Sequence, residues 1–509
     1  MIILRTNEIT EKQLAQIALS IQHRWNAPTF VKMHEIVIMD DDLDERSQKE
    51  LLRDFETGIY EIFEYLEIIS AFRLKRTGKS KYNIVGVPGA KLPQWMEDIL
   101  AEPKVPEGVF ACPHCVLPHT LILGDNKPIS EYSVGNNVLG RTGLNEVIQT
   151  FVRPYKGELI SIHANGMLPI LTTPEHPVLV SSSSTRQHRV AGHLASEISF
   201  SEEKWLPAGK LMSKNTSTDE NYVVVPIVAG SFKENRVGLS PFIKKHLPYH
   251  RAYRTDFPLN EKTAWLLGLF VAEGSITEKE VRFSLNRTEE EIRAEIVRIA
   301  NELGYSTITN YSQVVSSMLV IVTSRVLARA FDQWCGHRAP NKAIPDFILC
   351  HSDKRILASF LQGFEAGDSY DGINKLRGNK VYRTSITTSR ILAQQLQLAY
   401  ARLGIWSGVS VRSTHAEGLV MGRRCSLHVK YGVSYPLEPN LKRQKVRFLG
   451  DRVLSPIRKI TRTDYEGPVC NLHTTDNTYL VSNAIVHNCG RWFSSDMAMS
   501  LHQKIHYIA

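Results

Sequence analysis

The chain has 509 residues, of which 43% are hydrophobic and 22% charged, so it is long enough for several domains with buried cores. Its seven cysteines are too few, and odd in number, which excludes a disulfide scaffold. The first residues lack the pattern of a secretory signal, and the apolar run Trp265–Ala272 is too short for a membrane span. We therefore expect a soluble, cytoplasmic protein with no membrane partner.

The positive charge is concentrated in the centre of the chain. Lys and Arg number 61 against 52 Asp and Glu. Residues 1–114 hold 14 Lys/Arg and 18 Asp/Glu, and residues 489–509 hold two and one, so residues 115–488 carry a net charge of +12. A basic centre between near-neutral ends predicts contact with a polyanion, although a solvated basic surface would give the same count.

In chain order, residues 1–70 are expected to be mostly helical, and a repeated strand pattern follows. The segment Tyr155–His163 (YKGELISIH) has a counterpart in Tyr465–His473 (YEGPVCNLH). Each copy predicts a turn at its glycine, Gly157 or Gly467, followed by an alternating strand. The two copies lie near opposite ends of the basic centre. This wide separation predicts one β-rich unit that is interrupted by a long insertion.

A second repeat lies inside that insertion. Trp265–Ser275 (WLLGLFVAEGS) and Phe360–Tyr370 (FLQGFEAGDSY) each predict an apolar helix that ends near a glycine and an acidic residue. Strand-like alternation follows each run, and then a helix that closes on Leu-Gly, at 303–304 and 403–404. The pattern predicts a duplicated α/β unit of about one hundred residues.

A possible zinc site is divided between the two ends of the chain. Phe110–Cys115 reads FACPHC, while residues 489–509 begin with a cysteine and contain an HxxxH pair. Joining residues 1–114 directly to residue 489 gives FACPHCGRWFSSDMAMSLHQKIH, which resembles a two-Cys, two-His zinc finger. The resemblance implies a ββα finger whose ligands to Zn²⁺ are Cys112, Cys489, His502 and His506.

The residues at the two ends of the central segment suggest how it could be removed. The segment begins with Cys115 and ends with His487 and Asn488, and Cys489 follows directly. The Cys115 thiol can attack the preceding carbonyl, and Cys489 can take over the acyl group. Asn488 can then cyclise and cleave the chain behind itself. These intramolecular acyl transfers need proximity and proton donors but no cofactor.

The same segment closely resembles an intein, a self-splicing domain of the Hint type. The resemblance rests on CVLPHTLILGDNKPI at its start, GMLPILTTPEHPVLV at residues 166–180, and GPVCNLHTTDNTYLVSNAIVHN at its end. It implies a mainly-β, horseshoe-shaped fold in which Cys115 is the first nucleophile. Thr173 and His176 would polarise the scissile peptide and protonate its leaving nitrogen. His487 would assist cyclisation of Asn488, and Cys489 would accept the branched intermediate.

The duplicated helical runs resemble the two helices of a LAGLIDADG homing endonuclease. The resemblance implies close helix packing at glycines and a pair of carboxylates, Glu273 and Asp368, that would bind Mg²⁺ beside double-stranded DNA. Lys342 matches the family's basic residue near that site. Ala366 and Ser369 depart from the commoner residues, so a catalytically inactive endonuclease that keeps its fold is the alternative.

These interpretations give the following domains: residues 1–114, a mostly helical host segment; 115–235 and 441–488, the two parts of the splicing domain; 236–440, the endonuclease; and 489–509, the segment that completes the finger. We expect a monomer that binds its homing site on DNA. The partner of the spliced host product is not predicted beyond a weak nucleic-acid contact or a protein. Two alternatives remain: a DNA-binding zinc-finger protein with an inert insertion, and an autoprocessing domain that cleaves without ligating.

Overall fold

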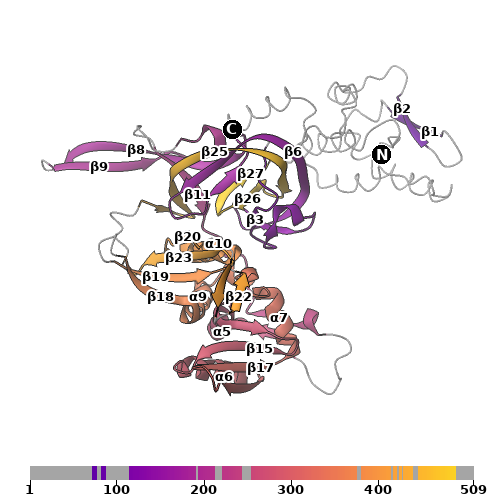
Figure 1. Ribbon diagram of the computed structural model, residues 1–509. Helices are drawn as coiled ribbons and strands as arrows, with labels where there is room; N and C mark the ends of the chain where they lie inside the picture. The colour runs from indigo at the N-terminus through magenta and orange to yellow at the C-terminus, as the bar shows by residue number, and fades with distance from the viewer. Residues whose placement is uncertain are drawn as a thin grey trace. The chain divides into compact units, whose positions relative to one another are not determined.

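The computed structural model describes residues 72–76, 82–86, 114–190, 193–212, 220–243, 254–374, 380–413, 417–420, 423–426, 428–438 and 445–488 (Figure 1). The predicted helices of residues 1–70 lie outside these ranges. Before residue 114 the described residues form the antiparallel strands β1 (Phe72–Arg76) and β2 (Tyr82–Gly86). No helix of the described part is long and apolar enough to cross a membrane.

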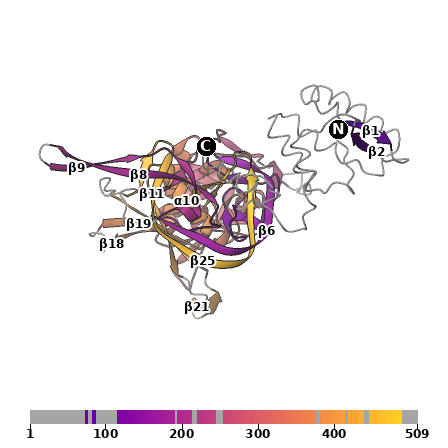
Figure 2. The ribbon, with the colours of Figure 1, turned by 90° about the horizontal axis from the view of Figure 1, so that it is seen from above.

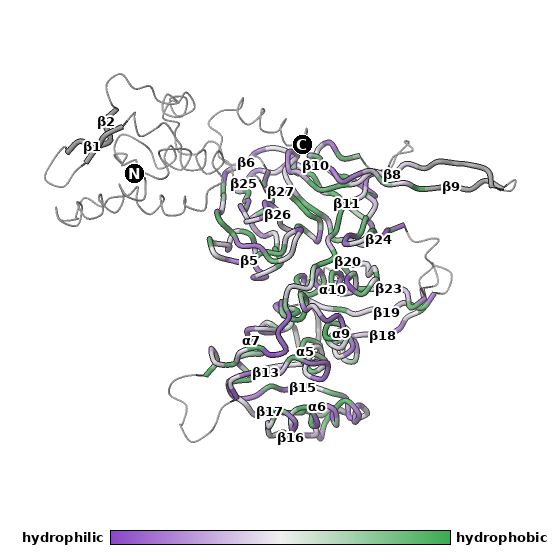
Figure 3. The backbone as a smooth tube through the Cα atoms, turned by 180° about the vertical axis from the view of Figure 1, so that it is seen from behind, coloured by the Kyte–Doolittle hydropathy of each residue, from purple (hydrophilic) through white to green (hydrophobic). Residues whose placement is uncertain are grey.

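One eleven-stranded sheet is built from both ends of the central segment. Its main path runs β26-β27-β8-β11-β25-β6-β5, so strands that follow residue 446 are interleaved with strands that precede residue 227. The strands are β5 (Asn137–Leu139), β6 (Leu144–Ala164), β7 (Ile170–Thr172), β8 (Pro177–Val190), β9 (His193–Phe200), β10 (Lys204–Pro207), β11 (Glu220–Pro226), β24 (Arg447–Leu449), β25 (Arg452–Thr474), β26 (Thr478–Val481) and β27 (Ala484–His487). This topology agrees with a β-rich unit interrupted by an insertion. Strand β11 is one of the strands whose apolar residues line the core of this unit (Figure 3).

The prediction of turns at Gly157 and Gly467 was wrong. The two repeated segments form the C-terminal parts of β6 and β25, which run on through both glycines and pair antiparallel along most of their length (Figure 2). Gly157 faces Tyr465, and Gly467 faces Tyr155. Each tyrosine folds over the glycine on its own strand, where a Cβ would lie within 2.8 Å of the hydroxyl. The glycines therefore leave room for the tyrosine hydroxyls and do not mark a change of chain direction.

Two units of the same topology follow one another in the insertion. The first has helices α5 (Glu261–Glu273), α6 (Glu290–Glu302) and α7 (Arg325–Cys335), with strands β14 (Gly274–Ile276), β15 (Glu280–Asn286), β16 (Ser306–Tyr311) and β17 (Ser317–Thr323) in the order β14-β15-β17-β16. The second has α8 (Asp346–Leu349), α9 (Lys354–Asp368) and α10 (Arg390–Arg402), with β18 (Ser369–Asn374), β19 (Lys380–Thr387), β20 (Gly408–Ser413) and β23 (Lys430–Pro436) in the equivalent order β18-β19-β23-β20. The equal orders confirm the predicted duplication.

Local signals in the sequence fix the ends of the equivalent helices. The side chain of Asn260 caps α5 by accepting from Thr263 N, and Asp353 caps α9 in the same way from Arg355 N. Helices α6 and α10 both lead into a glycine with positive φ, Gly304 at 76° and Gly404 at 80°. The repeated Leu-Gly pairs are therefore the ends of matching helices.

Shorter hairpins complete the described fold. They are β3 (Leu121–Ile122) with β4 (Lys127–Pro128), β12 (Arg236–Gly238) with β13 (Asp256–Pro258), and β21 (Glu417–Val420) with β22 (Arg423–Ser426). The eleven-stranded sheet stops at Pro226 and resumes at Arg447, while the sheets of the duplicated unit lie between these residues. The domain boundaries at 235/236 and 440/441 stay predictions, and the second of them lies outside the described residues.

Candidate functional site

The first junction is built around Cys115, which is fully buried. The amide nitrogen of Cys115, which would be the leaving nitrogen, donates to Thr173 Oγ1 at 3.0 Å. Thr173 N donates back to Cys115 O at 2.9 Å. Thr173 stands at the end of β7, whose residue Thr172 forms a bridge with Val116. This pairing of backbones holds the Thr173 hydroxyl against the peptide bond that would be broken.

His176 lies beside the same junction but at a different atom. Its Nδ1 is 3.3 Å from Cys115 O, and its ring centroid is 6.1 Å from that of His114. The backbone of His176 is held on both sides, because its N donates to Thr173 O and its O accepts from Ala208 N. Thr173 is therefore the residue at the Cys115 nitrogen, while His176 lies at the Cys115 carbonyl.

The second junction holds the Asn488 side chain in a defined orientation. Asn488 is fully buried, and its Nδ2 donates to Thr474 Oγ1 at 3.1 Å, while Thr474 N lies 3.4 Å from Asn488 Oδ1. The backbone N of Asn488 donates to Asn477 O. Thr474 Oγ1 in turn donates to Thr478 O at 2.9 Å. Both atoms of the carboxamide that would cyclise are thus directed by one threonine.

The histidines of the two junctions lie beside paired strands, because His176 directly precedes β8 and β8 pairs with β27. His487 ends β27, and its ring meets Trp205 edge-on with centroids 5.1 Å apart. Tyr479 on the neighbouring strand β26 meets the ring of His176 edge-on, with centroids 6.2 Å apart. The Tyr479 hydroxyl donates to the buried Asn471 Oδ1 at 2.8 Å. Tyr479 therefore connects the histidine of the first junction to the hairpin that carries the second.

Sequence reasoning missed Thr474, because its role depends on a distant partner, Asn488, and no pattern marks it. It also missed Asp476, whose carboxylate accepts from the N and Oγ1 of Thr478 and from Thr142 Oγ1. These bonds fix the turn before β26. Four predicted residues lie outside the described ranges: Cys112, Cys489, His502 and His506.

The second candidate site is formed where helices α5 and α9 pack together. A Cβ on Gly268 would lie 1.9 Å from Phe360 O, and a Cβ on Gly363 would lie 2.0 Å from Trp265 O. Only glycine allows backbones to approach this closely. Each helix ends in its acidic residue, Glu273 in α5 and Asp368 in α9. The glycines therefore bring the two predicted carboxylates to the same end of the helix pair.

Three ionisable groups at this end of the helix pair have shifted pKa values. Burial, together with the nearby Glu273, raises the pKa of Asp368 to about 7. Burial and Glu289 also raise the pKa of Glu273. Burial lowers the pKa of Lys342 to about 8, against the opposing effect of nearby acidic groups that include Asp368. Lys342 Nζ donates to Phe270 O at 2.9 Å and lies 3.6 Å from the Phe270 ring centroid.

Two crowded carboxylates are a fitting donor set for a hard divalent cation, because the cation would offset both their repulsion and their burial. Within the described residues, no three His, Cys, Asp or Glu side chains gather into a larger metal cluster. A cation at Glu273 and Asp368 would therefore take its remaining ligands from water and from a substrate, as Mg²⁺ commonly does.

Comparison with known families identifies part of this architecture. Residues 260–335, which include α5, its Glu273 and the rest of the first repeat, match the sequence profile of the LAGLIDADG-like domain. This match confirms the predicted resemblance for that part of the chain.

Curated relatives extend over a larger share of the chain. It is 29% identical over 420 residues to the ATP-dependent DNA helicase Hel308 of Thermococcus kodakarensis, a match that covers 74% of this chain and 36% of the helicase. It is 27% identical over 380 residues to an iron-sulfur cluster assembly SufBD family protein of Mycobacterium tuberculosis, covering 72% and 41%. An uncharacterised protein of Methanocaldococcus jannaschii is 25% identical over 472 residues, covering 85% and 56%. The chain thus spans between a third and three fifths of the length of these relatives.

Among solved structures, the homing endonuclease I-DmoI in complex with DNA and Mn resembles part of the chain. The sequence identity is 13% and the TM-score 0.24, and the match covers 34% of this chain and 89% of the endonuclease.

Proposed function

We propose that this chain is a self-splicing precursor in which residues 115–488 excise themselves and join the flanking residues. The observation that carries the proposal is the arrangement at the two ends of this segment. The nitrogen of the first scissile bond donates a hydrogen bond to Thr173 Oγ1. The carboxamide of Asn488, whose cyclisation would break the second bond, donates a hydrogen bond to Thr474 Oγ1. The joined product would consist of residues 1–114 followed directly by residues 489–509.

The reaction begins with an acyl shift at Cys115. Its Sγ adds to the carbonyl carbon of His114, the C–N bond breaks, and the thiol proton ends on the freed nitrogen of Cys115. The Thr173 hydroxyl, already hydrogen-bonded to that nitrogen, stabilises the nitrogen as the C–N bond breaks. His176 is adjacent and supplies the proton relay. The product is a thioester between residues 1–114 and the Cys115 sulfur.

Transfer and release complete the sequence. Cys489 Sγ attacks the thioester, takes the acyl group and returns the thiol to Cys115. Asn488 Nδ2 then attacks its own carbonyl carbon, which breaks the bond to Cys489 and leaves a cyclic imide on the excised segment. The freed amine of Cys489 attacks the new thioester and forms the final peptide bond. His487, which precedes Asn488 and packs against Trp205, assists the cyclisation of Asn488.

The relatives support the proposal that the central segment is an insertion found in unrelated host proteins. A helicase and an iron-sulfur cluster assembly protein are named for unlike activities, yet each shares about three quarters of this chain. A self-removing insertion explains such a distribution, because it leaves each host intact after splicing. A DNA-binding protein with an inert insertion does not need the Cys115 and Asn488 arrangements, and cleavage without ligation does not need a nucleophile at Cys489.

For the nested domain we propose Mg²⁺-dependent cleavage of double-stranded DNA. Glu273 and Asp368 would hold the metal ion, which supplies a Lewis acid at the scissile phosphate. Lys342, held by Phe270, would place its positive charge beside the same phosphate. The net charge of +12 over residues 115–488 suits contact with a DNA backbone. The natural substrate would be the coding sequence in which codons 114 and 489 are adjacent.

The spliced product would carry a zinc finger at its end, with Cys112, Cys489, His502 and His506 as the ligands. In the precursor, these cysteines and the Cys115 thiol could hold zinc before splicing. Because the thiolates are the nucleophiles, zinc bound there would slow the first steps.

The residue roles are tested by expressing the full chain with Cys115→Ala and Asn488→Ala together. We expect no joined product and no cleavage at either junction. The matched control is Cys335→Ala, which removes another buried thiol, from α7 of the endonuclease, and should splice normally. A joined product from the double variant would contradict the assignment of both residues.

The nuclease is tested with a duplex of the joined coding sequence, in Mg²⁺ and with Glu273→Gln as the comparison. Double-strand cleavage that is lost in the variant supports the proposal. No cleavage by the wild-type chain would indicate the inactive alternative.

A further inference from the structure

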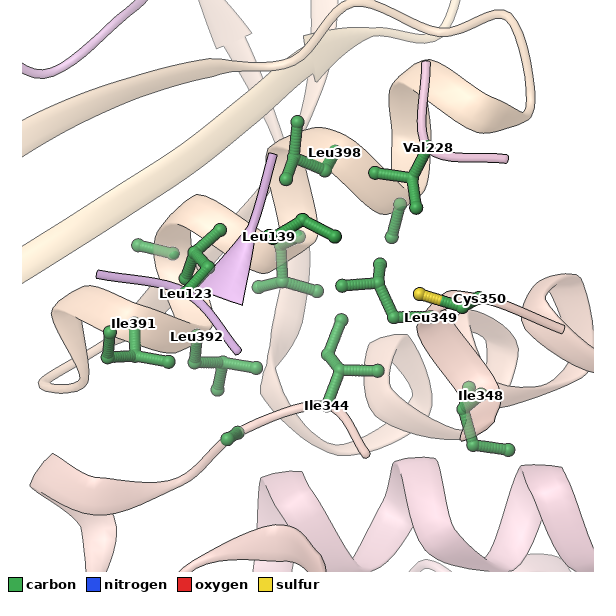
Figure 4. Close-up of a cluster of buried hydrophobic side chains, with 14 of the residues drawn as sticks. Leu123, Leu139, Val228, Ile344, Ile348, Leu349, Cys350, Ile391, Leu392 and Leu398 are labelled. Atoms are coloured by element: carbon green, nitrogen blue, oxygen red, sulfur yellow. The ribbon is translucent and has the colours of Figure 1, made fainter. Parts of the chain in front are cut away.

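Helix α10 of the endonuclease is unusual because it is buried on every side. All residues from Ile391 to Arg402 are buried, whereas an ordinary surface helix buries one stripe. One side of α10 packs on its own sheet, against β20 and β23. The other side meets the splicing domain, where Leu392 and Ile391 lie beside Leu123 and Leu139 (Figure 4). The helix therefore belongs to the cores of both domains.

Gln397, in the middle of α10, makes three side-chain hydrogen bonds, and two of them reach the splicing domain. Its Nε2 donates to Gly166 O at 2.6 Å and to Ser407 O at 2.7 Å. Its Oε1 accepts from Asn483 Nδ2 at 3.0 Å. Gly166 and Asn483 belong to the two separate parts of the splicing domain, one before the endonuclease in the sequence and one after it. One buried side chain thus connects two distant turns.

The first of these turns supports the junction at Cys115. Gly166 has a positive φ of 75°, and its carbonyl also accepts from Val409 N at 2.9 Å. Strand β7 begins shortly afterwards, at Ile170, and delivers Thr173 to the scissile nitrogen. The position of the Gly166 carbonyl therefore influences the position of the Thr173 hydroxyl.

The second turn supports the junction at Asn488. Ser482 and Asn483 both have positive φ, 48° and 70°, which non-glycine residues adopt at a cost. Asn483 Nδ2 also donates to Gln394 O at 3.0 Å, so α10 anchors the strained turn twice. Only the buried strand β27 separates this turn from Asn488. A shift of the turn would therefore reach the cyclising carboxamide.

We propose that Gln397 is a positioning residue for splicing, which holds both turns and through them sets the geometry of both junctions. The endonuclease repeat would then be a structural part of the splicing site as well as a nuclease. This inference rests on the proposed splicing function.

The test measures the two junctions separately in the full-length chain. Thioester formation is followed as release of residues 1–114 by added dithiothreitol in an Asn488→Ala background, in which cyclisation is blocked. Cyclisation is followed as release of residues 489–509 in a Cys115→Ala background. Each background then receives one of three further substitutions, and each chain is assayed well below its own melting temperature.

The three substitutions separate positioning from stability. Gln397→Met keeps the length of the side chain without its bonds, and should slow both reactions about tenfold or more. Asn483→Gly removes the bonds to α10 but suits the positive φ, and should slow cyclisation alone. Tyr400→Phe is the control, because it removes a buried bond from the same helix to Glu365 without touching either turn. It should change neither rate.

Each outcome decides a different point. Rates for Gln397→Met that stay within about twofold of the parent chain would overturn the positioning role. Equal slowing by Tyr400→Phe would show that any weakening of α10 has this effect, and would also overturn it. If the parent chains themselves show neither reaction, the proposed splicing function fails and this inference fails with it.

Discussion

The packing of α5 against α9 gives a prediction whose size can be worked from the structure. A Cβ placed on Gly268 would lie 1.9 Å from Phe360 O, whereas real Cβ atoms do not approach within 3.0 Å. The obstacle is backbone, so Gly268→Ala must separate the helices by roughly 1 Å, the difference between those two distances. Overpacking of this kind costs about 1–3 kcal/mol and occasionally more, and we expect the upper end of that range.

The separation of α5 and α9 should also displace the carboxylates at their ends. Glu273 and Asp368 are the last residues of the two helices, so a shift of about 1 Å would lower DNA cleavage on the order of 100-fold. Urea unfolding measures the stability, and cleavage of the joined coding sequence measures the activity. The control is Gly238→Ala, because nothing lies within 4 Å of a Cβ at that position. Gly268→Ala behaving like Gly238→Ala in both assays would refute the reasoning.

Four further predictions each concern one residue or one ligand. Thr173→Val removes the acceptor for Cys115 N and should slow dithiothreitol-induced release of residues 1–114 on the order of tenfold, and an unchanged rate would exclude this role. Tyr479→Phe should cost about 1 kcal/mol in thermal unfolding, because the hydrogen bond to Asn471 Oδ1 is lost while Leu472 N still donates to that oxygen. Lys342 loses its proton as the pH rises through about 8, since burial disfavours the charged form, so cleavage that needs this charge should fall above pH 8. A Lys342→Met variant that keeps this descending limb would show that another group causes it. Added Zn²⁺ should slow splicing and a chelator should restore it, and equal rates under the two conditions would rule out zinc control.

The sequence was informative where chemistry or repetition leaves a local mark. The two Gly-and-acid helical runs predicted the pair α5 and α9, and their downstream Leu-Gly pairs marked the ends of α6 and α10. The repeated Tyr-x-Gly segments revealed one interrupted β unit, but their glycines were misread. A glycine in a turn and a glycine beneath a tyrosine ring look the same in the sequence. Only the pairing of β6 with β25 shows which of the two is present.

The residues that sequence reasoning missed act through contacts that no short pattern records. In the sequence Thr474 looks like an ordinary strand residue, and only the fold brings Asn488 close enough to donate a hydrogen bond to it. Gln397 reads as one polar position in a helix, and its importance comes from Gly166 and Asn483, which lie far from it in the sequence on either side. Such roles depend on how two domains pack, which is set by the whole chain rather than by a local motif.

The central claim is tested most directly by the mass of what the expressed chain becomes. The account predicts two species: the excised segment 115–488, which ends in a cyclised Asn488, and a joined protein whose digest contains a peptide that spans His114 and Cys489. The intact precursor as the only species, or the flanks 1–114 and 489–509 released separately and never joined, would contradict it.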